Sequence, residues 1–127
     1  ANAEDSRVHI LSSGGAGLDR AFAEYPSGAP FAVAFYSESC MHCKQMRAPF
    51  LACSREFPSI NFIAIPVNIP SNRELAVRYA IEFVPCLVYF PSSAKPDTHV
   101  HYSGDPNLKQ VRAFLIQQLE ASGVIHS

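Results

Sequence analysis

The segment Phe31–Phe57 reads FAVAFYSESCMHCKQMRAPFLACSREF, and it joins an apolar run to an amphipathic pattern through the tetrapeptide Cys40-Met41-His42-Cys43. The run Phe31–Tyr36 is apolar without alternation, which is typical of a parallel strand buried on both faces. Beyond it, apolar residues recur at the three- and four-residue spacings of one helix face, namely Cys43, Met46, Phe50, Cys53 and Phe57. The pattern predicts a strand followed by a helix, with Cys40 at the helix N-terminus.

The predicted place of Cys40 has a chemical consequence. Unpaired backbone N–H groups and the helix dipole stabilise negative charge at a helix N-terminus, and the thiolate is the reactive form of cysteine. Cysteines of Cys-X-X-Cys motifs at helix starts have pKa values of roughly 3.5 to 7.5 instead of about 8.5. A protonated His42 would favour the thiolate further. We therefore expect Cys40 to be a nucleophile, Cys43 the resolving thiol and His42 a residue that tunes the pKa of Cys40.

On these residues the chain resembles the thioredoxin superfamily, from about Val8 to Leu119. The resemblance rests on FYSESCMHCK at 35–44, on the apolar stretch that follows at 60–67, and on FVPCLVYF at 83–90. It implies that Pro85 is a cis-proline facing the two cysteines. It also implies that Met41, Val84 and Pro85 contact the substrate.

The resemblance further implies a thiol–disulfide oxidoreductase that acts on protein or peptide thiols and disulfides and needs no cofactor beyond the Cys40–Cys43 disulfide. A histidine before the second cysteine, as His42 is here, resembles protein disulfide isomerases and periplasmic oxidases. It favours the oxidant or isomerase direction and an oxidising compartment such as the secretory pathway, although no targeting segment is visible. The alternative is a thioredoxin-fold binding or chaperone module with weak redox turnover.

The implied fold class is α/β: a thioredoxin fold with a mixed sheet of about four to five strands, flanked by about four helices in the order β-α-β-α-β-α-β-β-α. We expect strands at 7–11, 31–36, 60–67, 86–90 and 98–102. Helices are expected through Leu18 and Tyr25, after Cys40, after a capping box at Ser71–Glu74, and after an N-cap and N1 proline within Gly104–Asn107. Residues 1–127 are expected to form a single domain, with Ala1–Ser6 flexible.

Composition bears on the class of partner. The 127 residues carry a formal net charge of −1, so electrostatics gives no reason to expect nucleic acid or an anionic membrane as a partner. No apolar run reaches the roughly 18 to 20 residues of a membrane span. Because the sequence starts at Ala1 without an initiator methionine, we expect a processed or trimmed N-terminus. The chain is also consistent with one domain of a larger protein.

Several cysteine and histidine residues allow more than one interpretation. Zinc is disfavoured, because Cys40, His42 and Cys43 crowd into one turn without a matching pair of ligands elsewhere. Cys53 lies about 15 Å along the helix from Cys43, too far for a disulfide, and is interpreted as a core thiol. For Cys86 three interpretations stay open: a small core residue, a partner of Cys53, or a third thiol near the active site. The pair His99 and His101 suits a solvated strand face better than a metal site.

The resemblance also shows three departures from the family pattern. Ser39 stands where the family usually has an aromatic residue before the first cysteine, which predicts a more polar substrate surface. Ala34 replaces a buried carboxylate, and Pro66 replaces its lysine partner. Without that carboxylate, we expect slow release of the mixed disulfide unless water or Glu38 accepts the proton of the second thiol.

Overall fold

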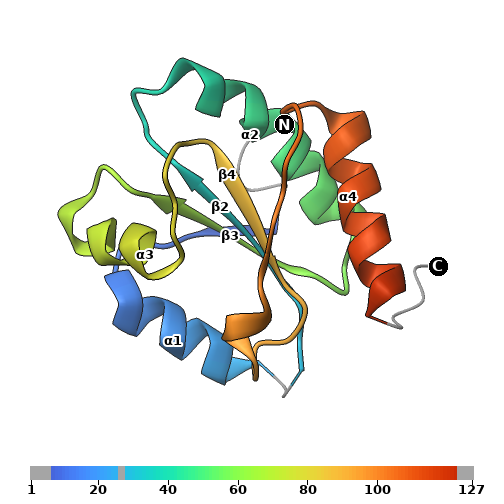
Figure 1. Cartoon of the computed structure of the whole chain (residues 1–127), viewed down its shortest axis with the longest axis horizontal. Helices are drawn as coiled ribbons and strands as arrows, with labels where there is room; N and C mark the ends of the chain where they lie inside the picture. Colours follow the sequence, from blue (N-terminus) through green and yellow to red (C-terminus); the bar gives the residue numbers. More distant parts are fainter. Residues whose placement is uncertain (1–6, 26–27, 123–127) are drawn as a thin grey trace.

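The computed structural model describes residues 7–25 and 28–122, where five strands form one mixed sheet (Figure 1). The strands are β1 (Val8–Ile10), β2 (Phe31–Tyr36), β3 (Asn61–Pro66), β4 (Cys86–Phe90) and β5 (Val100–His101). Their order across the sheet is β1-β3-β2-β4-β5; β1, β3 and β2 are parallel, and β4 is antiparallel to β2 and β5. The expected order of elements along the chain is confirmed, whereas the expected flexibility of Ala1–Ser6 lies outside the described residues.

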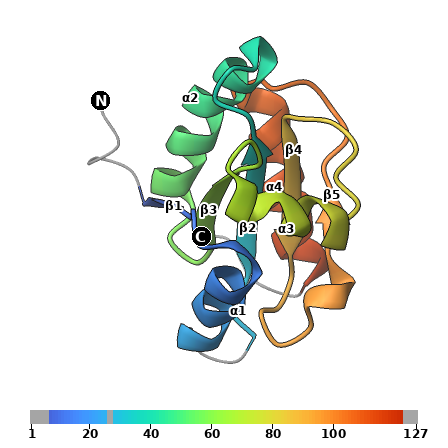
Figure 2. The ribbon, with the colours of Figure 1, turned by 90° about the vertical axis from the view of Figure 1, so that its left-hand side faces the viewer.

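Helices cover both faces of this sheet. One face carries α1 (Gly14–Glu24) and α3 (Arg73–Arg78), and the other carries α2 (Met41–Glu56) and α4 (Leu108–Ala121). Two short 3₁₀ helices, Pro70–Asn72 and Pro96–Thr98, complete the connections. Figure 2 views the sheet from the side of α3, with α4 behind the strands and with β1 and β5 at opposite edges.

The central strand β2 supplies both hydrophobic cores, because successive side chains of a strand point to opposite faces. Phe31, Val33 and Phe35 pack into the core beneath α1 and α3, whereas Ala32 and Ala34 face the core beneath α2 and α4. All five side chains are buried, as the unbroken apolar run predicts. Burying each phenylalanine contributes about 1.5 to 3 kcal/mol. The five-residue apolar stripe from Cys43 to Phe57, which follows α2 to its C-cap, is buried as well.

Two predicted helix starts are wrong in detail. The hydroxyl of Ser71 donates to the carbonyl of Ser12 instead of capping a helix, and α3 begins at Arg73. At α4 the N-cap is Asn107, whose side chain accepts a hydrogen bond from the backbone N–H of Gln110 at 2.9 Å. Pro106 therefore lies before the N-cap of α4 instead of at N1, and the N-cap of α3 is Asn72, whose side chain makes no capping hydrogen bond.

Asn72 ties three connections together on the α1 side of the sheet. Its buried Oδ1 accepts a hydrogen bond from the N–H of Gly14 at 2.9 Å, and its Nδ2 donates to the carbonyls of Leu11 and Pro66 at 2.9 and 3.0 Å. Gly14 has φ +72°, and a Cβ there would lie 2.3 Å from the Ser71 carbonyl oxygen. Only glycine fits that close approach without strain. These bonds hold the ends of β1 and β3 and the start of α1 in place.

Candidate active site

Cys40 lies where the strand β2 gives way to the helix α2. Its backbone is extended, with φ −87° and ψ 122°, and it is the N-cap of the helix. The turn before it is closed by the N–H of Cys40, which donates to the Ser37 carbonyl at 3.1 Å. The Sγ of Cys40 accepts a hydrogen bond from the backbone N–H of Cys43 at 3.2 Å. The sulfur therefore occupies the place that a serine or aspartate oxygen takes in an ordinary N-cap.

The loop before β4 brings Val84 and Pro85 next to Cys40. The Val84–Pro85 peptide bond is cis, as expected. The carbonyl oxygen of Val84 lies 3.9 Å from Cys40 Sγ, at the outer limit for a thiol that donates a hydrogen bond. Residues 44 positions apart in the sequence thus meet at the start of α2, and a backbone carbonyl stands beside the sulfur.

The two sulfur atoms differ in ionisation. The pKa of Cys40 is lowered, chiefly by a hydrogen bond from the Cys43 thiol and then by the backbone N–H groups of Cys43 and His42. Burial, followed by the same contact with Cys40, raises the pKa of Cys43 to about 11. Cys43 is only 6% exposed, and its Sγ accepts a hydrogen bond from the N–H of Ser37 at 3.4 Å. The geometry favours one accessible thiolate, at Cys40, beside one buried thiol.

His42 and Met41 occupy the first turn of α2 and are exposed. In this geometry His42 acts on Cys40 through its backbone N–H, so a role for the imidazole stays a prediction. Met41 is 71% exposed and presents its side chain to solvent one residue from Cys40. Ser39, on the other side of Cys40, is exposed and shares a hydrogen bond with the hydroxyl of Ser37 at 3.2 Å.

Phe83 is a candidate site residue that sequence reasoning missed. It is 75% exposed, although it directly precedes the half-buried Val84 and Pro85. A phenylalanine left in water costs free energy that a bound apolar partner would recover. The signal in the sequence is that an aromatic residue follows the charged Glu82 and comes directly before Val84-Pro85. Phe83, Met41, Val84 and Pro85 together form what we call the apolar rim of Cys40.

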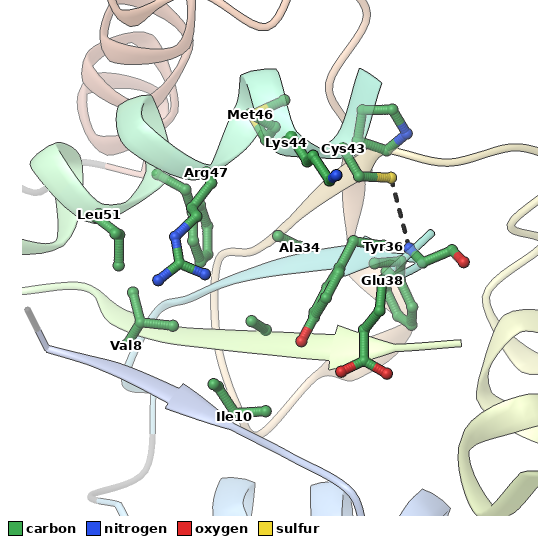
Figure 3. Close-up of a pocket in the computed structure, with 15 residues that line it drawn as sticks. Val8, Ile10, Ala34, Tyr36, Glu38, Cys43, Lys44, Met46, Arg47 and Leu51 are labelled. Atoms are coloured by element: carbon green, nitrogen blue, oxygen red, sulfur yellow. Dashed lines mark hydrogen bonds between the residues drawn. The ribbon is translucent and has the colours of Figure 1, made fainter. Parts of the chain in front are cut away.

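A cavity of about 390 Å³ lies behind Cys43, between α2 and the strands β1, β3 and β2 (Figure 3). Cys43, Pro85 and Ala34 all line it. Open space therefore lies next to the buried thiol, at the position where the family pattern has a carboxylate and this chain has Ala34. Figure 3 also shows the hydrogen bond from Ser37 to Cys43 Sγ at the edge of this space.

The remaining two cysteines are free thiols on opposite faces of the sheet. Cys53 belongs to the core beneath α2 and α4, and Cys86 to the core beneath α1 and α3. The suggested Cys53–Cys86 disulfide is therefore wrong, because the sheet separates the two residues. The Sγ of Cys86 lies 4.0 Å from Nδ1 of His101, and burial raises its pKa. For Cys53, burial is the main cause that raises the pKa to about 12.

The rings of His99 and His101 are tilted against each other with centroids 5.5 Å apart. His99 precedes β5, and its Nδ1 lies 2.9 Å from the Pro96 carbonyl oxygen. Within residues 7–25 and 28–122, no group of three or more histidine, cysteine or acidic side chains is placed to hold a metal ion. In the same residues, no helix is both long and apolar enough to cross a membrane.

Comparisons with known proteins bear on this arrangement. The family model described as Thioredoxin matches residues 19–117. The structure of thioredoxin from Fasciola hepatica is 22% identical, covers 88% of this chain and 98% of its own, and superposes with a TM-score of 0.70. Thioredoxin NaTrxh from Nicotiana alata is 17% identical, with 93% and 97% covered and a TM-score of 0.76.

The J-Trx1 fragment of ERdj5 is 23% identical; 92% of this chain matches 54% of that fragment, with a TM-score of 0.73. At these identities the three solved structures show a shared fold. Comparison with curated protein sequences returns no significant match.

Proposed function

Because the chain belongs to the thioredoxin family, we propose that it is a thiol–disulfide oxidoreductase in which Cys40 is the nucleophile and Cys43 the resolving thiol. The observation that supports this most is the lowered pKa of Cys40 at the N-cap of α2, beside a cis-proline loop. A lowered pKa increases the fraction of Cys40 present as the nucleophilic thiolate, and the residue is partly exposed to solvent. We further propose that residues 1–127 are one redox domain, either alone or within a larger protein.

The proposed reaction has two exchange steps. The Cys40 thiolate attacks one sulfur of a substrate disulfide, forming a Cys40–substrate mixed disulfide and releasing the first substrate thiolate. Cys43 then loses its proton and attacks Cys40 Sγ. This forms the Cys40–Cys43 disulfide and releases the second substrate thiolate, so the substrate gains two electrons that the protein loses. In the oxidant direction the same steps run in reverse. The Val84 carbonyl and the apolar rim position an extended substrate segment beside Cys40.

Trapping the intermediate tests this assignment. Cys40→Ser should abolish reduction of a peptide disulfide, whereas Cys43→Ser should accumulate a mixed disulfide that mass spectrometry detects at Cys40. Cys53→Ala is the matched control, since it removes a buried thiol that takes no part in the two steps. Full turnover in Cys40→Ser would show that another group is the nucleophile.

We further propose that the Cys40–Cys43 pair oxidises or isomerises its substrates. His42 favours an oxidant or isomerase in an oxidising compartment, as the family resemblance implies. Equilibration of the Cys40–Cys43 pair in glutathione buffers measures its reduction potential. A value above about −200 mV supports the oxidant or isomerase, and a value near −270 mV marks a reductant.

A binding or chaperone module is the second candidate, and the exposure of Met41 and Phe83 favours it. These two large apolar side chains, one next to Cys40 and the other next to Val84 in the sequence, would hold an unfolded client without any exchange step. Client binding by a Cys40→Ser/Cys43→Ser variant distinguishes the candidates. Retained binding together with negligible turnover in the native protein would favour the module.

A further inference from the structure

The cavity behind Cys43 adjoins the surface that carries Cys40 through Pro85, which lines the cavity and also belongs to the apolar rim. Cys40 and the exposed Met41 and Phe83 do not line it, whereas the buried Cys43 does. Its volume of about 390 Å³ falls in the range of pockets that bind small molecules, roughly 300 to 1,000 Å³. The thiol–disulfide chemistry proposed above needs no space of this size on the far side of Cys43.

The cavity exists because two alanines lie side by side on neighbouring strands. Ala34 of β2 and Ala64 of β3 are register partners, and both line the cavity on the sheet side, while Phe50 and Leu51 line it from α2. Methyl side chains leave the space that larger residues would fill between the sheet and the helix. Ile10 of β1 extends the same apolar lining toward the sheet edge. An apolar ligand body of moderate size would meet hydrocarbon on the sheet side and on the helix side.

The rim of the cavity on the helix side is basic. Lys44 and Arg47 lie one turn apart on α2, are exposed and line the cavity. In Figure 3 both side chains extend from α2, whereas those of Tyr36 and Glu38 come from the strand side. Among residues 7–25 and 28–122, no ion pair involves Lys44 or Arg47. Glu38 is the acidic residue of the lining, and its Oε1 already accepts a hydrogen bond from Asn68 Nδ2 at 3.0 Å.

We propose that this cavity binds a small organic anion with an apolar body, such as an aromatic carboxylate. The hydrocarbon body lies on Ala34 and Ala64 between β2, β3 and α2, and the carboxylate meets the cations of Lys44 and Arg47. Two cations against one hydrogen-bonded carboxylate favour an anion over a cation of the same shape. Burial of the apolar body provides the main driving force.

Two naphthalene probes of opposite charge test the proposal. Titration of the reduced protein into 2-naphthoate or 2-naphthylmethylammonium is followed by the fluorescence polarisation of the probe, and the chain contains no tryptophan to interfere. Saturable binding of 2-naphthoate at least tenfold tighter than that of the ammonium is expected. No saturable binding of naphthoate at millimolar concentration, or equal binding of both probes, would overturn the proposal.

Charge-reversal variants locate the bound anion. Arg47→Glu should weaken naphthoate binding about three- to tenfold. Arg55→Glu makes the same change on the same helix at an exposed position outside the cavity lining, and it should leave binding unchanged. Equal effects of the two variants would show that only the net charge matters, and the site would be rejected. Ala64→Leu, which fills the space on the sheet side, should abolish binding of both probes while circular dichroism reports the fold.

Binding and redox activity are separable in this design. The titration contains no disulfide substrate, and it is repeated with Cys40→Ser, which removes the proposed nucleophile outside the cavity. Unchanged naphthoate affinity in that variant is the expected result. An inactive redox assay would therefore leave the binding result standing, and absent binding would leave the assignment of Cys40 untouched.

Discussion

The backbone N–H of Cys43 donates a hydrogen bond to Cys40 Sγ over 3.2 Å, because Cys40 is the N-cap of α2 and Cys43 is its third helical residue. N-cap side chains ordinarily accept such a bond through oxygen. Here the acceptor is sulfur, which accepts more strongly when it carries a charge. The interaction that begins the helix therefore also stabilises the thiolate.

This relationship predicts that Cys40 ionises well below Cys43. The pKa of Cys40 is lowered, chiefly by the Cys43 thiol, and that of Cys43 is raised to about 11 by burial. As the pH rises, Cys40 should lose its proton before Cys43 does. Iodoacetamide labelling between about pH 5 and 9, with mass spectrometry of the peptides, should show Cys40 modified first, with an inflection below about 8.5. Faster labelling of Cys43 would contradict the geometry.

Two substitutions of Cys43 separate the causes of this shift. Cys43→Ala removes the side-chain donor, so the inflection of Cys40 labelling should move to higher pH. Cys43→Ser keeps an O–H donor and should move it less. Both variants keep the backbone N–H that donates to Cys40. Inflections that stay at the native value in both variants would assign the lowered pKa to the helix terminus alone.

The apolar rim predicts a specific role for Phe83. Phe83→Ala should raise KM for a peptide disulfide about three- to tenfold, because the exposed ring no longer contacts the bound segment. Its reaction with a small disulfide such as 5,5′-dithiobis(2-nitrobenzoate) should stay unchanged, since Cys40 is untouched. Val77→Ala on α3, where Val77 is 80% exposed, is the matched apolar control. A KM increase shared by both variants would remove the special role of Phe83.

Local periodicity predicted the β2–α2 junction correctly, because the apolar run at 31–36 and the stripe on α2 each reflect burial within a single element. Among features that depend on distant partners, the cis-proline loop at Pro85 was expected from the family resemblance, whereas others were not predicted. Ser71 does not cap a helix, because its hydroxyl donates a hydrogen bond to the carbonyl of Ser12.

The cavity depends on the pairing of Ala34 with Ala64 across two strands, and strand register is not visible in a sequence. The sequence likewise does not show that Cys53 and Cys86 lie on opposite faces of the sheet, because this depends on how the strands and helices pack.

Cys86 is predicted to be dispensable for exchange. It is buried, its pKa is raised, and its contact with His101 Nδ1 is long at 4.0 Å. A thiol that stays protonated reacts slowly. Cys86→Ala should therefore keep the turnover of the native protein, and iodoacetamide should label Cys86 only after Cys40. Loss of turnover with an unchanged melting temperature would instead identify Cys86 as a third working thiol.

Asn72 is predicted to be the polar side chain on which the α1 side of the sheet depends. Asn72→Ala removes the partner of the Gly14 N–H and a donor to two carbonyls, those of Leu11 and Pro66. An unsatisfied buried group costs about 1 to 3 kcal/mol, so the free energy of unfolding should fall by about 2 to 5 kcal/mol in urea titrations. Asn68→Ala removes an exposed asparagine and should change it by less than about 0.5 kcal/mol. A similar small loss for Asn72→Ala would mean that water replaces the amide.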